Sequence, residues 1–194
     1  MSAQPNPRLT PEQYLAIDRE AELRSEYYDG EMFEISAATY AHALTSTNLT
    51  ILLGVALKPH GCTVVSSSLR VRASAGRSYC YPDLAVICGE PRFADDQKDT
   101  VVNPVLIIEV LSKSTEANDR GFKFAQYRQI ESVQEYVLVS VVEPRIEIFR
   151  RGPTDGWIFH DVSVPGAVCE FTSVGVKFAL ADVYKNVPLF EASA

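Results

Sequence analysis

The sequence has none of the closely spaced cysteine pairs that mark a zinc site or a compact disulfide framework. Its four cysteines, at positions 62, 80, 88 and 169, include no Cys-x-x-Cys pair. Such pairs supply the ligands of structural zinc sites, and small disulfide-stabilised domains carry a higher density of cysteine. We therefore expect reduced, buried thiols in a cytoplasmic protein.

Long apolar runs are missing as well. No stretch approaches the roughly 20 consecutive apolar residues that a membrane-spanning helix needs. Residues 1–8 have no charged start followed by an apolar core, so they do not predict a signal peptide. Residues 1–9 are expected to form a disordered lead-in. Residues 10–190, which contain no linker or repeat, are expected to form a single domain.

Positive charge is in the minority. Lys and Arg number 18 and Asp and Glu number 25, which gives a net charge of −7. This balance disfavours non-specific binding of nucleic acid over the whole surface, although it is compatible with a local basic face. Helix-turn-helix and zinc-finger patterns are also absent, so the sequence indicates no sequence-specific reading of DNA.

The first third of the chain predicts two helices around a strand pair. Thr10 and Gln13 have the spacing of a capping box at the start of a helix. Residues 27–35 are typical of strand structure with a turn at Asp29-Gly30. Residues 38–57 then carry apolar residues at helical spacing and predict a long helix.

From residue 62 onward the apolar period becomes two, which is typical of strands. Residues 105–111 are too uniformly apolar for a half-exposed strand, so we place them in the middle of a sheet. A helix is expected over residues 118–130 and a polar loop over residues 89–103. The other expected strands are 62–66, 69–72, 79–87, 135–141, 145–150, 157–162 and 168–171. This order indicates an α/β (α+β) fold, with a mixed central sheet between helices and a β-rich C-terminal extension.

Two carboxylates lie on strands that the core should bury. Asp83 lies in residues 81–87, and Glu109 lies near the end of the apolar residues 104–111. A buried carboxylate is costly unless a metal, a lysine or an arginine neutralises it. Lys123, on the helix that follows, is 14 residues after Glu109. A structural ion pair is the simpler interpretation of either acid alone. Together, the two acids and the lysine favour metal-dependent cleavage of a phosphodiester.

The order of these residues resembles the PD-(D/E)XK nuclease superfamily and, within it, the Uma-two family of restriction-type endonucleases. The similar features, spread over residues 10–150, are Glu26 to Glu31, His42, Pro82-Asp83, Glu109 to Ser112, a helix with Asp119, Lys123 and Tyr127, and Glu135 to Val139. The superfamily pattern places lysine two residues after the acid, where this chain has Leu111. In the resembling family the lysine comes from the following helix, as Lys123 does.

The resemblance implies a restriction-endonuclease-like fold and a Mg²⁺ or Mn²⁺ site. Asp83, Glu109 and the backbone carbonyl of Val110 would bind the metal. Lys123 would orient the attacking water or stabilise developing charge. The accessory residues would be His42, Glu31 and Tyr127. Two alternatives stay open: a structural hydrogen-bonding role for His42, and Lys113 in place of Lys123.

The implied partner is nucleic acid, with DNA as the expected substrate. Arg70, Arg72 and Arg120 are the candidate contacts, and a solvated surface position is the alternative for each. The apolar strands 145–150 and 157–162 offer an edge through which two copies could associate, so we expect a homodimer.

Two other functions fit parts of the pattern. One is a nuclease-like fold without activity that serves as a binding or assembly module, which the intact Asp83, Glu109 and Lys123 oppose. The other is a glycoside hydrolase that uses Asp83 and Glu109 as an acid and base pair, which the apolar strands and the lysine oppose. A requirement for metal would separate all three.

Overall fold

A six-stranded mixed sheet lies at the centre of the computed structural model, which describes residues 8–154 and 156–189. In order across the sheet, the strands are β11 (Trp157–Val162), β10 (Ile146–Arg151), β9 (Glu135–Val139), β8 (Leu106–Val110), β6 (Leu84–Cys88) and β3 (Cys62–Ser66). Strands β8 and β9 are parallel, and the other neighbouring pairs are antiparallel. Every residue of β8 and β9 is buried, which confirms the central position expected for residues 105–111.

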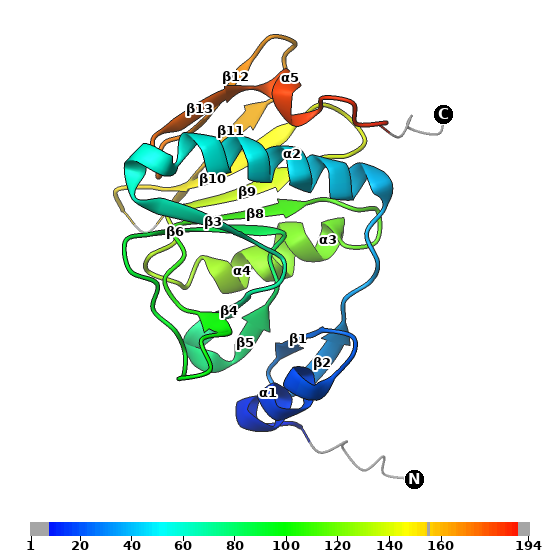
Figure 1. Cartoon of the computed structure of the whole chain (residues 1–194), viewed down its shortest axis with the longest axis vertical. Coiled ribbons are helices and arrows are strands. Elements are labelled where there is room, and N and C mark those ends of the chain that lie inside the picture. The colour runs from blue at the N-terminus through cyan, green and yellow to red at the C-terminus, as the bar shows by residue number, and fades with distance from the viewer. Residues whose placement is uncertain (1–7, 155, 190–194) are drawn as a thin grey trace.

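One face of this sheet is covered by α2 (Tyr40–Ala56), which crosses it in Figure 1. Thr39 caps the helix by accepting a hydrogen bond from the amide of His42. Leu49 and Leu53, one helical turn apart, are fully buried in the core against the sheet. The same core includes the expected β-rich extension, formed by β12 (Val168–Phe171), β13 (Val176–Ala179) and the short α5 (Leu180–Val183).

The opposite face is covered by a helical stretch made of α3 (Glu116–Asn118), η3 (Asp119–Lys123) and α4 (Phe124–Tyr127). Tyr127 and Ile130 pack against Ile107 and Leu138 in a second apolar core. The helix expected over residues 118–130 is thus in the right place, but its middle part η3 is a π-helical turn, which the apolar pattern did not indicate. No helix in the described part of the chain is long and apolar enough to cross a membrane.

A second sheet of five strands contributes to the same core as this helical stretch. Its strands, in order, are β2 (Glu31–Glu34), β1 (Ser25–Tyr28), β5 (Ser78–Cys80), β4 (Arg70–Ala73) and β7 (Thr100–Val101). The helix α1 (Pro11–Glu20) packs on it, and its capping box between Thr10 and Gln13 is formed as expected. Of the expected lead-in, residues 1–7 lie outside the described residues. Short 3₁₀ turns are η1 (Lys58–His60) and η2 (Ser74–Gly76).

The expectation of one continuous strand over residues 79–87 is wrong, because the chain forms two strands there, β5 and β6. The chain leaves the five-stranded sheet after β5 and enters the central sheet at β6. Pro82 lies between them, and a proline has no N–H with which to continue a hydrogen-bonded ladder. This break places Asp83 directly before β6, next to the central strand β8. The loop expected over residues 89–103 likewise contains the short β7, which runs parallel to β4.

Two of the four cysteines form a disulfide, so the expectation that all of them are reduced is wrong. Cys62 and Cys88 lie directly opposite one another on β3 and β6, with their Cα atoms 4.0 Å apart. Strand pairing brings them together across 26 residues of sequence, a separation at which spacing gives no signal. Cys80 and Cys169 are free and buried, as expected.

Candidate active site

Asp83 and Glu109 come together because β6 and β8 are antiparallel neighbours. Leu84 lies opposite Ile108, so the preceding Asp83 lies beside Glu109. The amide of Asp83 donates to Glu109 Oε2 at 3.3 Å, and the amide of Val110 donates to Asp83 Oδ2 at 2.7 Å. Each carboxylate is therefore held by the backbone of the other strand.

Glu109 points toward the helical stretch that covers this face of the sheet. Side chains alternate along a strand, so Glu109 projects on the same side as the core residue Ile107. Only 3% of Glu109 is exposed, and its Oε1 accepts hydrogen bonds from Lys123 Nζ at 3.2 Å and from the Tyr127 hydroxyl at 3.1 Å. Burial raises the pKa of Glu109 well above its ordinary value, with Lys123 opposing the rise and neighbouring acids adding to it.

Lys123 is a buried cation among three acids. Its Nζ lies 3.0 Å from Glu26, 3.2 Å from Glu109 and 3.5 Å from Asp119. Burial disfavours the charged ammonium, but these carboxylates outweigh it and raise the pKa of Lys123 well above its ordinary value. The side chain is therefore a fixed positive charge at neutral pH. Lys113, the competing lysine, is exposed and forms no ion pair within the described residues.

Glu26 on β1 is the acid that sequence reasoning undervalued. Its Oε1 binds Lys123 and also accepts a hydrogen bond from the amide of Tyr81 at 3.0 Å, two residues before Asp83. Glu31, the acid expected here, is instead exposed on β2 and away from these residues. The sequence pattern could not show which of Glu26 and Glu31 reaches the site, because only folding brings the β1–β2 hairpin to Lys123.

Asp119 completes the cluster of acids. It is 2% exposed, and η3 turns it and Lys123 to the same side of the helical stretch. Its Oδ1 accepts no hydrogen bond within the described residues. Burial raises the pKa of Asp119, with Lys123 opposing the rise. Thus, among the described residues, Asp119, Glu109 and Glu26 share one cationic partner, Lys123.

His42 joins the site from the first turn of α2. Its Nε2 lies 3.2 Å from Asp83 Oδ2. Burial lowers the pKa of His42, but the hydrogen bond and the negative charge of Asp83 outweigh that and raise it overall. The structure therefore brings His42 to the acid pair as the sequence suggested, as a partner of Asp83.

A cleft of about 1260 Å³ opens over these residues. One side is formed by the β1–β2 hairpin and the start of α2, and the other by the end of β8 and the start of the helical stretch. In Figure 1 this is the side of the molecule where α2 begins and β8 ends. Asp83, Glu109, Asp119 and Lys123 all line the cleft, so a substrate could reach them.

The acid pair fits an open site for a hard divalent cation. Across residues 8–154 and 156–189, no three His, Cys, Asp or Glu side chains converge as they would in a closed, fully protein-ligated metal site. Magnesium needs only one or two carboxylates, because it keeps several of its waters. The excess of acid lining the cleft favours a bound cation electrostatically.

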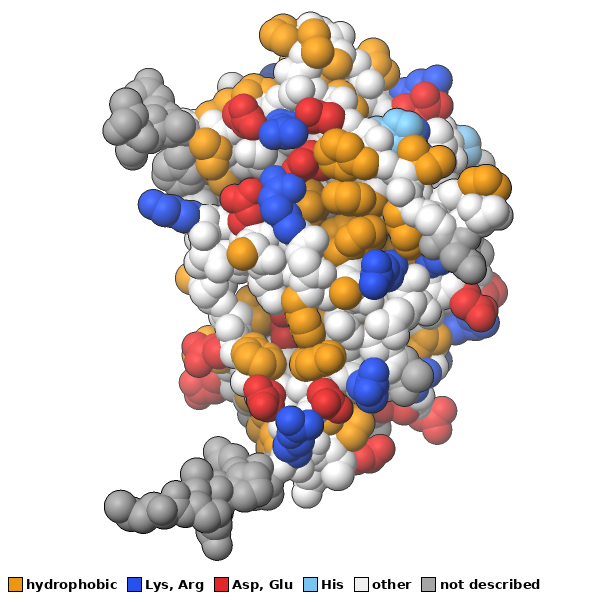
Figure 2. All heavy atoms as spheres, turned by 180° about the vertical axis from the view of Figure 1, so that it is seen from behind, with side chains coloured by type: hydrophobic (Ala, Val, Ile, Leu, Met, Phe, Trp, Pro, Cys, Tyr) orange, Lys and Arg blue, Asp and Glu red, His pale blue; other side chains and the backbone are white. Residues whose placement is uncertain are grey.

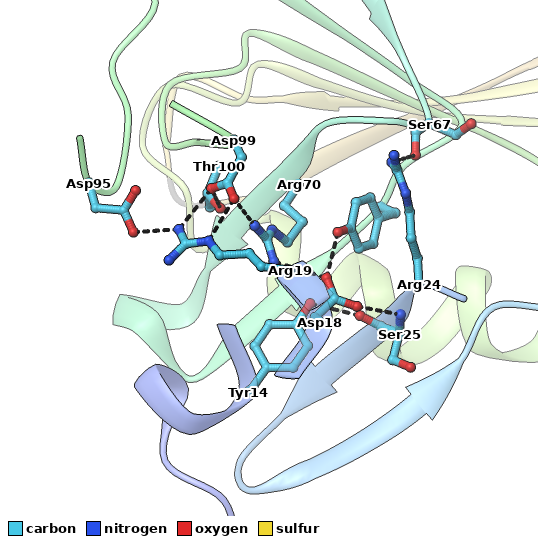
Figure 3. A network of polar contacts seen from close by, with 11 residues as sticks. Tyr14, Asp18, Arg19, Arg24, Ser25, Ser67, Arg70, Asp95, Asp99 and Thr100 are labelled. Carbon is cyan, nitrogen blue, oxygen red and sulfur yellow. Dashed lines mark hydrogen bonds and ion pairs between the residues drawn. The ribbon is translucent and has the colours of Figure 1, made fainter. Parts of the chain in front are cut away.

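Arg70 is not placed to contact nucleic acid, which corrects the expectation from the sequence. It is 2% exposed, and its guanidinium binds Asp18 at 2.9 Å and also binds Asp99 (Figure 3). Arg19 reaches the same Asp99 at 2.8 Å. Because Asp18 lies on α1, this ion pair ties that helix to β4.

The other two candidate arginines lie outside the cleft. Arg120, on the helical stretch, is bound to Glu116 at 2.7 Å and to Glu147 of β10 at 2.5 Å. Arg72 is half-buried on β4 and lines a separate hollow of about 280 Å³ with Arg92. Neither residue lines the cleft over the acids, so the basic surface expected near the site is not formed by these side chains.

The mixed central sheet with helices on both faces has a restriction-endonuclease-like fold. The structure is similar to the crystal structure of "a putative nuclease belonging to DUF820" from Anabaena variabilis. The TM-score is 0.70, and the similarity covers 91% of this chain and 97% of that chain at 16% sequence identity. At this identity the likeness shows the shared fold.

The chain belongs to the Uma2 family, described as "Putative restriction endonuclease", which matches residues 11–181. This confirms the resemblance seen in the sequence. Two similar proteins come from Synechocystis sp.. Uncharacterized protein slr1290 is 31% identical over 185 residues, covering 94% of this chain and 95% of the relative. Uncharacterized protein sll1609 is 34% identical over 164 residues, covering 84% and 93%.

Proposed function

We propose that the protein is a metal-dependent endonuclease that hydrolyses phosphodiester bonds in DNA. One observation carries the proposal: Asp83 and Glu109 lie side by side in an open cleft, each held by the other's strand, with the ammonium of Lys123 on Glu109. Membership of the Uma2 family and the nuclease fold support the reaction class.

Asp83, Glu109 and the backbone carbonyl of Val110 would hold Mg²⁺ or Mn²⁺. Bound there, the metal would polarise the phosphoryl group and lower the pKa of the attacking water. The chain orients Asp83 for this role, because His42 and the Val110 amide both contact Oδ2. Within the described residues, Oδ1 has no such partner and is the oxygen left to face a cation.

Lys123 would stabilise the negative charge that develops on the phosphoryl oxygens as water adds to phosphorus and one P–O bond breaks. Its position is fixed by Glu109, Glu26 and Asp119, so no reorganisation of the ammonium is required during the reaction. Tyr127 donates to the same oxygen of Glu109 and would limit its rotation.

A cleavage assay tests the proposal. Wild type should nick supercoiled plasmid with Mg²⁺ or Mn²⁺ and not with EDTA, whereas Asp83→Asn and Glu109→Gln should lose activity. Asp161→Asn is the control. Asp161 is an acid on β11 that is also bound to a cation, Arg145, but it lies outside the cleft. If the Asp83→Asn/Glu109→Gln double variant binds Mn²⁺ with wild-type affinity in calorimetry, the metal site is wrong. If wild type cuts no substrate with any metal, the inactive binding or assembly module becomes the better account.

We also propose that two copies associate through β11, an edge strand of the central sheet. Ile158 and Phe159 on this strand are each 50% exposed. Figure 2 shows apolar side chains gathered in the upper part of the face opposite α2. An exposed strand edge that carries large apolar side chains favours pairing with another chain, and a second copy would cover it.

A further inference from the structure

Exposed apolar side chains line part of the cleft, although the acids lie inside it. Leu23, Phe33, Ile35 and Ile51 line the cleft and are 62%, 50%, 39% and 59% exposed, respectively. We call these four side chains the apolar wall. Large apolar side chains grouped in a cleft are typical of a binding surface rather than of a solvated one.

The apolar wall is directly connected to the acid cluster. Phe33 on β2 lies opposite Glu26 on β1, and opposite residues in an antiparallel pair project from the same face with Cβ atoms about 5 Å apart. Glu26 in turn binds Lys123. A group packed against Phe33 would therefore lie close to the Lys123–Glu109 pair.

The charges of the cleft do not suit a DNA duplex. Six carboxylates line it, against three Lys or Arg side chains, and Lys123 is already engaged by acids. The other two are Arg24 and Lys113. Binding along a duplex draws its affinity from many cations that neutralise phosphates, and a single strand, with about half the charge per unit length, needs fewer of them. Affinity in this cleft has to come mainly from another source.

Arg24 and Tyr81 provide such a source beside the acids. The Arg24 guanidinium lies 5.3 Å from the centre of the Tyr81 ring, and Tyr81 is two residues before Asp83. Tyr81 is only 8% exposed, and its ring supports Arg24, which is exposed. A guanidinium plane can stack on a base that is not paired, and such a contact is sequence-tolerant. In a duplex the faces of the bases are covered by their neighbours.

We infer that the cleft takes a single-stranded segment of nucleic acid, with unpaired bases against the apolar wall and the guanidinium of Arg24. The backbone would then pass Asp83 and Glu109. The assignment of the cleft as a substrate site rests on the proposed nuclease function, but the preference for unpaired bases can be measured without cutting.

The test is fluorescence anisotropy in EDTA at one fixed salt concentration, with labelled oligothymidine, oligouridine and a DNA duplex of the same length. Wild type should bind the single strands at least about tenfold more tightly than the duplex. Phe33→Ala should weaken single-strand binding by about tenfold or more, the loss typical of one stacked base. Ile17→Ala is the control, because Ile17 is also a large apolar side chain, 47% exposed, but lies on α1 outside the cleft.

Binding of the duplex as tightly as the single strands would overturn the inference, and so would equal losses in Phe33→Ala and Ile17→Ala. A parallel cleavage assay with Mn²⁺ separates this inference from the proposed function. If the protein binds single strands through Phe33 but cuts nothing, the proposed function fails and the inference stands. If it cuts duplex faster than single strands and Phe33→Ala cuts normally, the proposed function stands and the inference fails.

Discussion

Replacing Lys123 with methionine should destabilise the protein, because it removes the counter-charge of a buried acid cluster. Among the described residues, Lys123 is the one Lys or Arg within ion-pair distance of Glu109, Glu26 and Asp119. Methionine keeps most of the apolar stem, so the change is one of charge more than of volume.

The expected loss is large because solvent screens this cluster poorly. Lys123 is 7% exposed and Glu109 is 3% exposed. Removing one partner of a buried ion pair typically costs about 3–5 kcal/mol, since the remaining charge is left without compensation. For a chain of this size, that corresponds to a fall in melting temperature of roughly 6–20 °C.

Thermal and urea denaturation at neutral pH in EDTA would measure the effect. Lys113→Met is the matched control, since Lys113 is exposed, and it should change the unfolding free energy by less than about 0.5 kcal/mol. The double variant Lys123→Met/Glu109→Gln should be more stable than Lys123→Met alone, because it also removes a negative charge. Melting of Lys123→Met within about 2 °C of wild type would refute the claim that this lysine compensates the acids.

Three further predictions concern charge, cysteine chemistry and assembly. The guanidinium of Arg19 beside Asp99 lowers the pKa of that carboxyl from 3.8 to about 2. The ionised carboxylate therefore stabilises the fold at pH values above this range, and the stabilisation is lost as the pH falls through it. The stability difference between wild type and Asp99→Asn should therefore persist down to about pH 4 and shrink as the pH falls toward 2, as urea denaturation on either side of the range would show. Alkylation and mass spectrometry of unreduced, denatured protein should find two free thiols, Cys80 and Cys169, and finding four would exclude the disulfide. Light scattering at micromolar concentration should report a mass above the 21.5 kDa of one chain, and Phe159→Asp should lower it; a wild-type mass of 21.5 kDa would rule out the dimer.

Much of the fold was predictable because its elements are encoded locally. The capping box at Thr10, the helix α2 and the buried strand β8 each follow from patterns within a few residues. The break at Pro82 and the Cys62–Cys88 disulfide depend on which sheet each strand joins. That choice is made by packing over long distances, which an apolar period does not record.

The candidate site divides in the same way. Asp83, Glu109 and Lys123 stand out in the sequence because buried charge is costly and has to be matched. Arg70 was misplaced because its partner Asp18 is 52 residues away, and a lone arginine on a strand resembles a surface residue. Glu26 was undervalued for a related reason, since only the folded hairpin brings it to Lys123.

The π-helical turn at η3 accommodates an extra residue between Asp119 and Lys123 without separating them. A π turn contains about one residue more than an α-helical turn, and each residue of an α-helix rotates the chain by about 100°. Deleting Gly121, around which a side chain would meet no neighbour, would let the stretch relax to an α-helix with Asp119 and Lys123 three residues apart, a spacing that still places them on one helical face. Chains that differ by one residue between the positions of Asp119 and Lys123 can therefore keep the same ion pair.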